Sequence, residues 1–152
     1  MAVSEPDDEI GRTNVNISER KTLTLAGCRK AMAAAEVEAT KSNLRVSIAI
    51  LDEAGHLLHF NRMDGIHVGT VDVAIAKARS AATFKRPTKT FADGYAMGMT
   101  ALPSLPGVLP FEGGVPIVVD GHYVGAIGVS GGPAEMDEKI ASAGAAVLTI
   151  DP

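Results

Sequence analysis

The feature that most constrains this chain is a glycine-bounded hairpin between Gly113 and Gly132. Two short apolar runs flank Asp120-Gly121, a dipeptide that favours a type I′ turn, so the segment predicts two paired strands. Gly113-Gly114 precedes this hairpin and Gly131-Gly132 follows it. Because the strands of a hairpin are antiparallel, both glycine pairs should lie at one end, where the backbone bends sharply or approaches something closely. This end of the hairpin is the candidate site.

The other elements follow from hydrophobic spacing and from turn residues. Apolar residues at three- and four-residue steps predict helices that begin after Thr24, cover 71–84, lie near 90–97 and cover 133–148. Apolar runs at 46–51 and 57–63, joined by a turn, predict a first hairpin. We therefore expect a single α+β domain, with a mainly antiparallel sheet built from two hairpins and covered by helices.

The composition limits what kind of protein this chain can be and which partners it can have. Residues 1–16 are polar and acidic and predict a flexible arm before a folded domain over 17–152. The chain has 46% hydrophobic residues, enough for one core, and its lone Cys28 cannot form an internal disulfide. Without a signal-like or membrane-length apolar segment, we expect a cytoplasmic protein with no membrane partner. The net charge of -4 argues against a nucleic-acid partner.

Arg62 and Asp64 close the first predicted hairpin. Residues two apart on a strand point to the same side, so these two side chains are expected to pair if the strand continues that far. The pair could pin the end of a strand, or either residue could face a ligand.

Lys77 is set among Ala74, Ala78 and Ala81 on one predicted helix face. Small neighbours leave room for the lysine stem to extend along the helix toward a cavity or a subunit boundary. The ammonium could then form an interface salt bridge, or it could bind a carboxylate of a small molecule, such as a haem propionate.

The glycine pairs have polar and aromatic neighbours. Phe111-Glu112 precedes the first pair, and Glu112 is a candidate general acid or base if the loop buries it, or otherwise an exposed loop carboxylate. Ser130-Gly131 precedes the last helix, whose free N–H groups could attract an anion. Three carboxylates in that helix argue against phosphate there: Glu135, Asp137 and Glu138.

The four histidines predict no metal site by their spacing, and structural zinc is not expected. His67, close to the corner at 62–65, is the best single candidate for an axial ligand of a haem iron. The chain has no G-x-S-x-G motif, no P-loop and no dinucleotide-binding glycine fingerprint. Hydrolase, nucleotide-binding and dinucleotide-binding functions therefore lack their key residues.

Several spaced motifs together resemble the GlcG/HbpS family over about residues 20–150: 46–58, Arg62-Met-Asp-Gly, Lys77-Ala, Gly113-Gly-Val-Pro and 124–131. The resemblance implies an α+β domain that assembles into homo-oligomers, often octamers. It also implies haem binding or haem degradation in some members, and fusion to a cobalamin adenosyltransferase in others. The positions that match family motifs are Arg62, Asp64, Lys77, Gly113, Gly114, Ser130 and Gly131.

Two hypotheses follow. In the first, an oligomer binds haem or a related tetrapyrrole between subunits, with Lys77 or Arg62 on a propionate and His67 near the iron. In the second, a cofactor-independent enzyme binds a small organic acid of a catabolic pathway through Arg62 or Lys77. Asp64 or Glu112 then moves a proton in an isomerisation, hydration or ring-opening step. The chain has only four Phe, two Tyr and no Trp, which disfavours haem, whereas the resemblance favours it.

Overall fold

The structure is a computed structural model that describes residues 15–149. Its elements are α1 (Leu25–Lys41), β1 (Ser47–Asp52), β2 (Leu57–Arg62), α2 (Gly69–Phe84), α3 (Thr88–Ala96), the short 3₁₀ helix η1 (Leu102–Ser104), β3 (Gly114–Val119), β4 (His122–Ser130) and α4 (Ala134–Thr149). The strands form an antiparallel sheet in the order β2-β1-β4-β3. The predicted α+β class with two hairpins is therefore confirmed.

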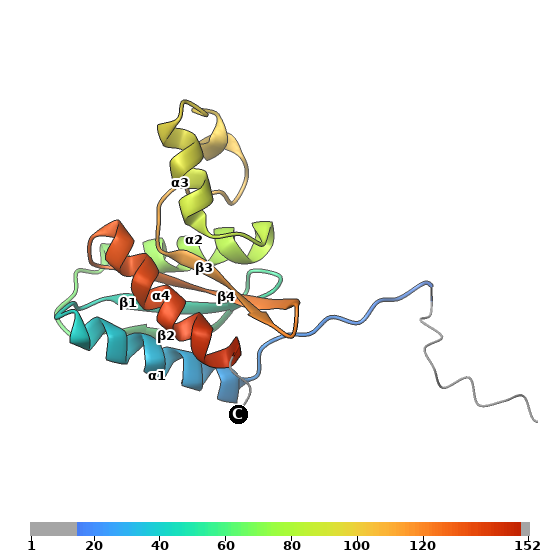
Figure 1. Cartoon of the computed structure of the whole chain (residues 1–152), viewed down its shortest axis with the longest axis horizontal. Coiled ribbons are helices and arrows are strands. Elements are labelled where there is room, and N and C mark those ends of the chain that lie inside the picture. The colour runs from blue at the N-terminus through green and yellow to red at the C-terminus, as the bar shows by residue number, and fades with distance from the viewer. Residues whose placement is uncertain (1–14, 150–152) are drawn as a thin grey trace, which may run out of the picture.

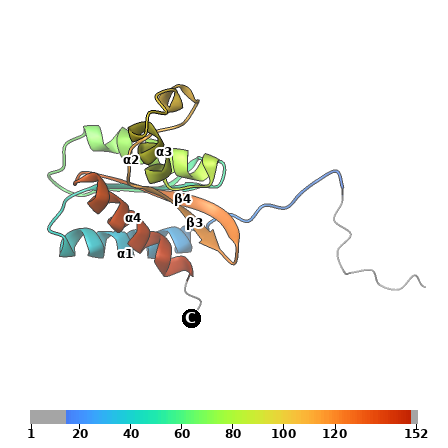
Figure 2. The same ribbon diagram turned by 45° about the horizontal axis from the view of Figure 1, so that its top comes forward.

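The sheet separates two helical layers. Figure 2 shows α2 and α3 on one face of the sheet, and α1 and α4 side by side on the other. Each hairpin contributes one central strand, because β1 and β4 pair with each other in the middle of the sheet. The two hairpins therefore form one continuous sheet, and the helices cover both of its faces.

The residues that predicted helix ends and turns have those roles. The Thr24 hydroxyl caps α1 by accepting a hydrogen bond from the Gly27 N–H at 3.1 Å. Asn43, just beyond α1, has φ 53°, the left-handed conformation that ends many helices. Asp120 and Gly121 have φ 49° and 77°, as a type I′ turn requires.

Some boundaries and one helix face differ from the sequence expectations. Helix α2 begins two residues before the predicted 71, and α3 ends one residue before the predicted 97. The spacing of apolar residues predicts that Met136, Ile140, Ala143 and Val147 form the buried face of the last helix, but the buried face is rotated in the structure. The buried residues of α4 are Asp137, Ile140, Ala141, Gly144 and Ala145. The predicted arm falls almost entirely on residues 1–14, which lie outside the described residues.

The larger part of the core lies between the sheet and the α1–α4 layer. Alternate residues of the central strands point into it, because successive side chains of a strand face opposite sides. Ile48 and Ile50 come from β1, and Ile127 and Val129 come from β4. Gly144 permits α4 to lie close to α1, since a Cβ there would come within 2.9 Å of the Ala31 carbonyl oxygen. This explains why the buried face of α4 includes a glycine.

The face of the sheet toward α2 is built from smaller residues. Gly114 and Gly128 lie directly opposite each other on β3 and β4. A Cβ on Gly128 would collide with the backbone of Ala74 and Ala78, and one on Gly114 would collide with the Lys77 carbonyl. The α2 backbone therefore rests almost directly on the sheet, and the Lys77 side chain starts close to the strand ends.

Residues 88–110 form a lobe that projects from the body and consists of α3, η1 and the loop that returns to β3 (Figure 1). Four large side chains of this projecting lobe are exposed by 46% to 80% of their area: Tyr95, Met97, Met99 and Leu105. A lobe with so much exposed apolar surface is typical of a segment that contacts another molecule.

Because α2 lies in close contact with the sheet, a methyl group added between them should destabilise the protein. Gly128→Ala should lower the free energy of unfolding by about 3 kcal/mol, because the new Cβ forces the α2 backbone away from the sheet. Gly27→Ala is the matched control, since its Cβ meets only ordinary contacts at 3.5 Å or more and alanine favours a helix. Urea unfolding would measure both; equal stability of the two variants would contradict this packing.

Candidate functional site

All four strands have one terminus at the same end of the sheet. Ser47, the first residue of β1, pairs with Arg62 at the end of β2 and with Ser130 at the end of β4. Strand β3 begins at this end with Gly114. We call this edge, with both glycine pairs, the glycine-rich end. The predicted site residues lie at or beside it: Arg62, Asp64, His67, Lys77, Phe111, Glu112, Gly113, Gly114, Ser130 and Gly131.

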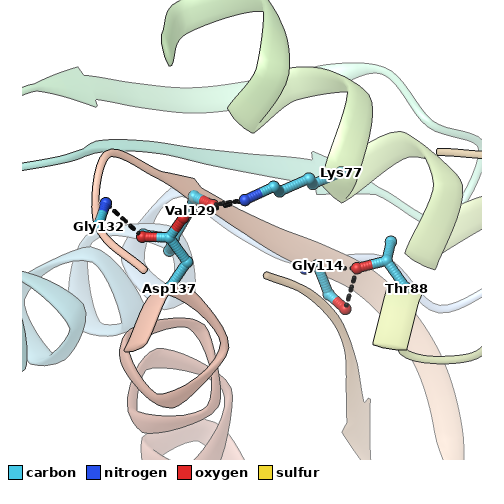
Figure 3. A network of polar contacts seen from close by, with 6 residues as sticks. All are labelled: Lys77, Thr88, Gly114, Val129, Gly132 and Asp137. Carbon is cyan, nitrogen blue, oxygen red and sulfur yellow. Dashed lines mark hydrogen bonds and ion pairs between the residues drawn. The ribbon is translucent and has the colours of Figure 1, made fainter. Parts of the chain in front are cut away.

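The Lys77 side chain is the most unusual group at the glycine-rich end. It is fully buried, at 0% exposure, although it carries an ammonium. Its Nζ donates hydrogen bonds to the Val129 carbonyl at 2.8 Å and to Oδ2 of Asp137 at 3.0 Å (Figure 3). Lys77 thus reaches past the sheet and joins α2 on one face to α4 on the other. The predicted contact of Lys77 with a cavity or a subunit boundary is in fact a contact inside the chain.

Asp137 also closes the turn between β4 and α4. Its Oδ1 accepts a hydrogen bond from the Gly132 N–H at 2.8 Å. Gly131 in this turn has φ 147°, a conformation that favours glycine. The Gly132 N–H, just before the helix whose N-terminus could attract an anion, is therefore already bound to a carboxylate of the protein itself.

Burial and pairing act in opposite directions on these two charges. Burial raises the pKa of the Asp137 carboxyl, and the Lys77 ammonium and the N–H groups of Gly131 and Gly132 oppose that rise. Burial likewise lowers the pKa of Lys77, and attraction to Asp137 and Glu112 opposes this shift. Each partner therefore keeps the other's charged form accessible inside the protein.

Phe111 and Gly113 complete the surroundings of the Lys77 ammonium. The centre of the Phe111 ring lies 5.0 Å from Nζ, a distance typical of a cation–π contact, and Phe111 is 53% exposed. Gly113 has φ 127°, and a Cβ there would lie 2.7 Å from Nζ. The glycine therefore leaves room for the buried lysine, while Phe111 offers an aromatic surface to solvent.

A second set of contacts fixes the base of the projecting lobe. The Gly114 N–H donates to Oγ1 of Thr88 at 2.9 Å, and both residues are buried (Figure 3). Because Thr88 begins α3 and Gly114 begins β3, this bond joins the two ends of the lobe. The lobe therefore leaves from and returns to the glycine-rich end, where its last residues lead into Phe111 and Glu112.

Arg62, Asp64 and His67 form the other part of the candidate site, and all three are exposed. Arg62 and Asp64 line an open depression of about 420 Å³ together with Arg45 and Met63. The predicted ion pair is wrong: within residues 15–149 no ion pair joins Arg62 to Asp64. Strand β2 ends at Arg62, so the alternation that would have aligned Asp64 with it does not continue.

The two parts of the site lie at opposite sides of the sheet end. Arg62 ends the edge strand β2, whereas Gly114 begins the other edge strand, β3. Three strand spacings separate these edges, which is about 14 Å. Asp64 and Glu112 therefore do not act on the same bond of a small substrate within one chain. A ligand that contacts both parts has to be large.

Sequence reasoning missed the role of Asp137 as the partner of Lys77. These residues are sixty positions apart, and their contact depends on how two helices pack across a sheet. The available signal is an aspartate in the first turn of α4, but an acidic residue there is equally expected as a complement to the helix dipole. A buried lysine at this position requires an acidic partner, but the sequence does not indicate which one.

The buried ion pair predicts non-additive mutations. Asp137→Asn should lower the free energy of unfolding by about 3 kcal/mol, because it leaves the Lys77 ammonium buried without a counter-charge. Adding Lys77→Met removes this stranded charge, so the double variant should be more stable than Asp137→Asn alone. Denaturant unfolding of four proteins measures this coupling: the unmodified protein, Asp137→Asn, Lys77→Met and the double variant. Strictly additive losses would show that the pair does not interact energetically.

These features define a class: an α+β domain with an open antiparallel sheet between helical layers and a glycine-rich sheet end held by a buried lysine. A family model described as "Haem degrading protein HbpS-like" matches residues 23–146. The chain belongs to this HbpS-like family, which confirms the resemblance found in the sequence.

Individual relatives agree with this assignment. Protein GlcG of Escherichia coli K12 is 44% identical over 99 residues, covering 65% of this chain and 74% of GlcG. The crystal structure of HbpS has a TM-score of 0.80 and 37% identity, and the match covers 87% of this chain and 94% of HbpS. The structure of a PduOC:haem complex has a TM-score of 0.75 and 26% identity over 86% of this chain and 97% of PduOC. None of the helices within 15–149 is long and apolar enough to cross a membrane.

Proposed function

We propose that this protein binds haem or a related tetrapyrrole at the glycine-rich end, in a homo-oligomer in which a second copy covers the ligand. The observation that carries the proposal is the half-exposed Phe111 ring over the buried Lys77 ammonium, beside the projecting apolar lobe. The family description and the similar PduOC:haem complex support the choice of ligand.

The residues at this end have the chemistry that a tetrapyrrole needs. Phe111 offers an aromatic face, and Arg62 offers an exposed guanidinium suited to a propionate. His67 offers an exposed imidazole as an axial ligand of the iron. Bound haem would supply redox and oxygen chemistry that these side chains lack. Lys77 already donates hydrogen bonds to Val129 and Asp137. Its role in this proposal is therefore to supply positive electrostatic potential behind Phe111, without direct contact with a propionate.

A second copy is needed because one chain offers little enclosure. The depression beside Arg62 is open, whereas ligand pockets normally bury most of the ligand surface. The exposed apolar side chains of the projecting lobe supply the missing surface when another copy packs against them. An octamer, as the family resemblance implies, is one assembly that would place several such lobes over neighbouring sites.

A haemin titration tests the proposal. The protein, with its mass in solution measured by light scattering, should give a saturable Soret shift at a fixed ratio of haem to chain. Phe111→Ala should weaken binding by about tenfold, because an aromatic contact with the ring is lost. His67→Ala should change the Soret position, because the axial ligand is lost.

The matched control is His122→Ala, which removes an exposed histidine from the start of β4, beside the β3–β4 turn at the other end of the sheet. It should leave both the affinity and the Soret position unchanged. A weak shift that does not saturate and is the same in all four proteins would reject the tetrapyrrole site. A monomer that still binds haemin at a fixed ratio would reject the role of the second copy.

A second candidate function is a cofactor-independent enzyme that acts on a small organic acid in catabolism. Glu112 favours it, because this half-buried carboxylate lies close enough to Lys77 to interact with its charge. Arg62 would bind a substrate carboxylate in the depression that it shares with Asp64. Since Asp64 and Glu112 are at opposite sides of the sheet end, only one of them serves as the acid or base in a given chain.

The two carboxylates can be separated by kinetics. An isomerase, hydratase or ring-opening activity should have a bell-shaped dependence of kcat/KM on pH. One of the variants Glu112→Gln and Asp64→Asn should lower kcat by about a hundredfold, and the other should leave it nearly unchanged. Screening small hydroxylated and unsaturated carboxylic acids provides the assay. Turnover that is unaffected by either variant would remove this mechanism.

A further inference from the structure

Arg45 is a second guanidinium at the glycine-rich end whose role the sequence does not indicate. It lies between α1 and β1, and its side chain is exposed. The carbonyl of the next residue, Val46, accepts a hydrogen bond from the Met63 N–H at 3.0 Å, so the Arg45 backbone lies beside the corner that follows β2. Arg45 lines the open depression of about 420 Å³ together with Arg62, Met63 and Asp64. Two guanidinium groups therefore share one depression.

Two glycines fix the place of Arg45. A Cβ on Gly131 would lie 2.5 Å from the Arg45 carbonyl oxygen, so the backbone of Arg45 packs directly on the turn after β4. Gly65 has φ 84°, and a Cβ there would collide with the Arg45 guanidinium. The guanidinium therefore lies over the Gly65 backbone, at the corner after Arg62, where the absence of a side chain leaves it room.

The two guanidinium groups are not neutralised by carboxylates of residues 15–149. Within this range no ion pair joins Arg45 or Arg62 to an acidic side chain, including Asp64 in the same depression. Two positive groups and one negative group leave the depression with a net positive charge. Cations that share a depression repel each other, and a bound anion relieves this repulsion.

The geometry of a guanidinium indicates which anion fits. Each one presents a planar fork of N–H donors that matches the two oxygens of a carboxylate. Two forks in one depression therefore suit a ligand with two carboxylates better than a ligand with only one. A tetrapyrrole such as haem carries its two propionates on one edge, and a small dicarboxylate presents the same two groups.

We propose that Arg45 is a further ligand-binding residue of this site, and that Arg45 and Arg62 together bind two carboxylates of one ligand. Under the proposed function, on which this part rests, the carboxylates are the propionates of haem, and the ring extends toward Phe111 at the other edge of the sheet. Asp64 repels such a ligand and so limits its affinity. The paired guanidinium groups themselves belong to the ligand-free protein.

Glutarate, a small dicarboxylate, tests the pair through the arginine Nε–H signals in a ¹⁵N NMR spectrum. It should shift the signals of Arg45 and Arg62 with one common midpoint. Butyrate should bind about tenfold more weakly, because it occupies only one fork, and Arg45→Gln should weaken glutarate by about as much. Arg29→Gln is the matched control, because it removes the same charge from an exposed position on α1. It should leave the midpoint unchanged.

Two further variants separate charge from position. Asp64→Asn should strengthen glutarate binding, because it removes a negative charge from the depression. Gly65→Ala keeps every charge but should weaken binding, because its Cβ displaces the Arg45 guanidinium. Gly121→Ala is the control for backbone strain, since Gly121 has a similar φ of 77° and a Cβ there meets nothing within 4 Å. It should bind glutarate as the unmodified protein does.

Three results would overturn the paired site. One is a glutarate titration in which the Arg45 and Arg62 signals shift at different midpoints or do not shift. Another is a glutarate affinity that Arg45→Gln leaves unchanged. The third is butyrate or inorganic phosphate that binds as tightly as glutarate, which would show a general anion site. None of these measurements depends on haem.

The identity of the ligand is tested separately, with haemin and with haemin dimethyl ester, which lacks both propionate charges. Arg45→Gln should weaken the binding of haemin by about tenfold and leave the binding of the ester unchanged. An equal loss for both ligands would show that Arg45 does not contact the propionates. If haemin does not bind the unmodified protein, the proposed function fails, while the glutarate titration still decides whether Arg45 and Arg62 bind a dicarboxylate.

Discussion

The ion pair between Lys77 and Asp137 connects the two helical layers across the end of the sheet. Lys77 comes from α2 on one face of the sheet and Asp137 from α4 on the other. The same carboxylate binds the Gly132 N–H, and the same ammonium binds the Val129 carbonyl. One buried ion pair therefore positions three segments: the end of β4 at Val129, the turn that follows it and the loop at Phe111.

Small residues make this interaction possible. The paired Gly114 and Gly128 let α2 lie against the sheet, and Gly113 leaves space for the lysine head. A larger residue at any of these places would displace either the helix or the ammonium. Glycine is therefore needed here for close packing around a charge, in addition to its usual role in turns. The projecting lobe returns to this fixed point, which places Phe111 and Glu112 beside the buried pair.

Local features of the sequence were sufficient to predict the fold. The type I′ turn at Asp120-Gly121, the Thr24 cap and the alternating strands depend on neighbours along the chain, and the structure has all three. The same reasoning located the glycine-rich end. It could not predict that Asp137 binds Lys77, nor that Arg62 and Asp64 form no ion pair within residues 15–149, because these facts depend on helix packing and on where a strand stops. The identity of the ligand rests on relatives and on the proposal above.

Native-state hydrogen exchange would test the central role of the buried pair most directly. The Gly132 N–H lies in a turn, where amides normally exchange quickly, but here it binds a buried carboxylate. We expect it to exchange only in global unfolding, at the same free energy as the Val129 N–H in β4, which bonds to the Gly113 carbonyl. Exchange of Gly132 at the rate of an open turn, while Val129 remains protected, would show that Asp137 does not hold this end of the sheet.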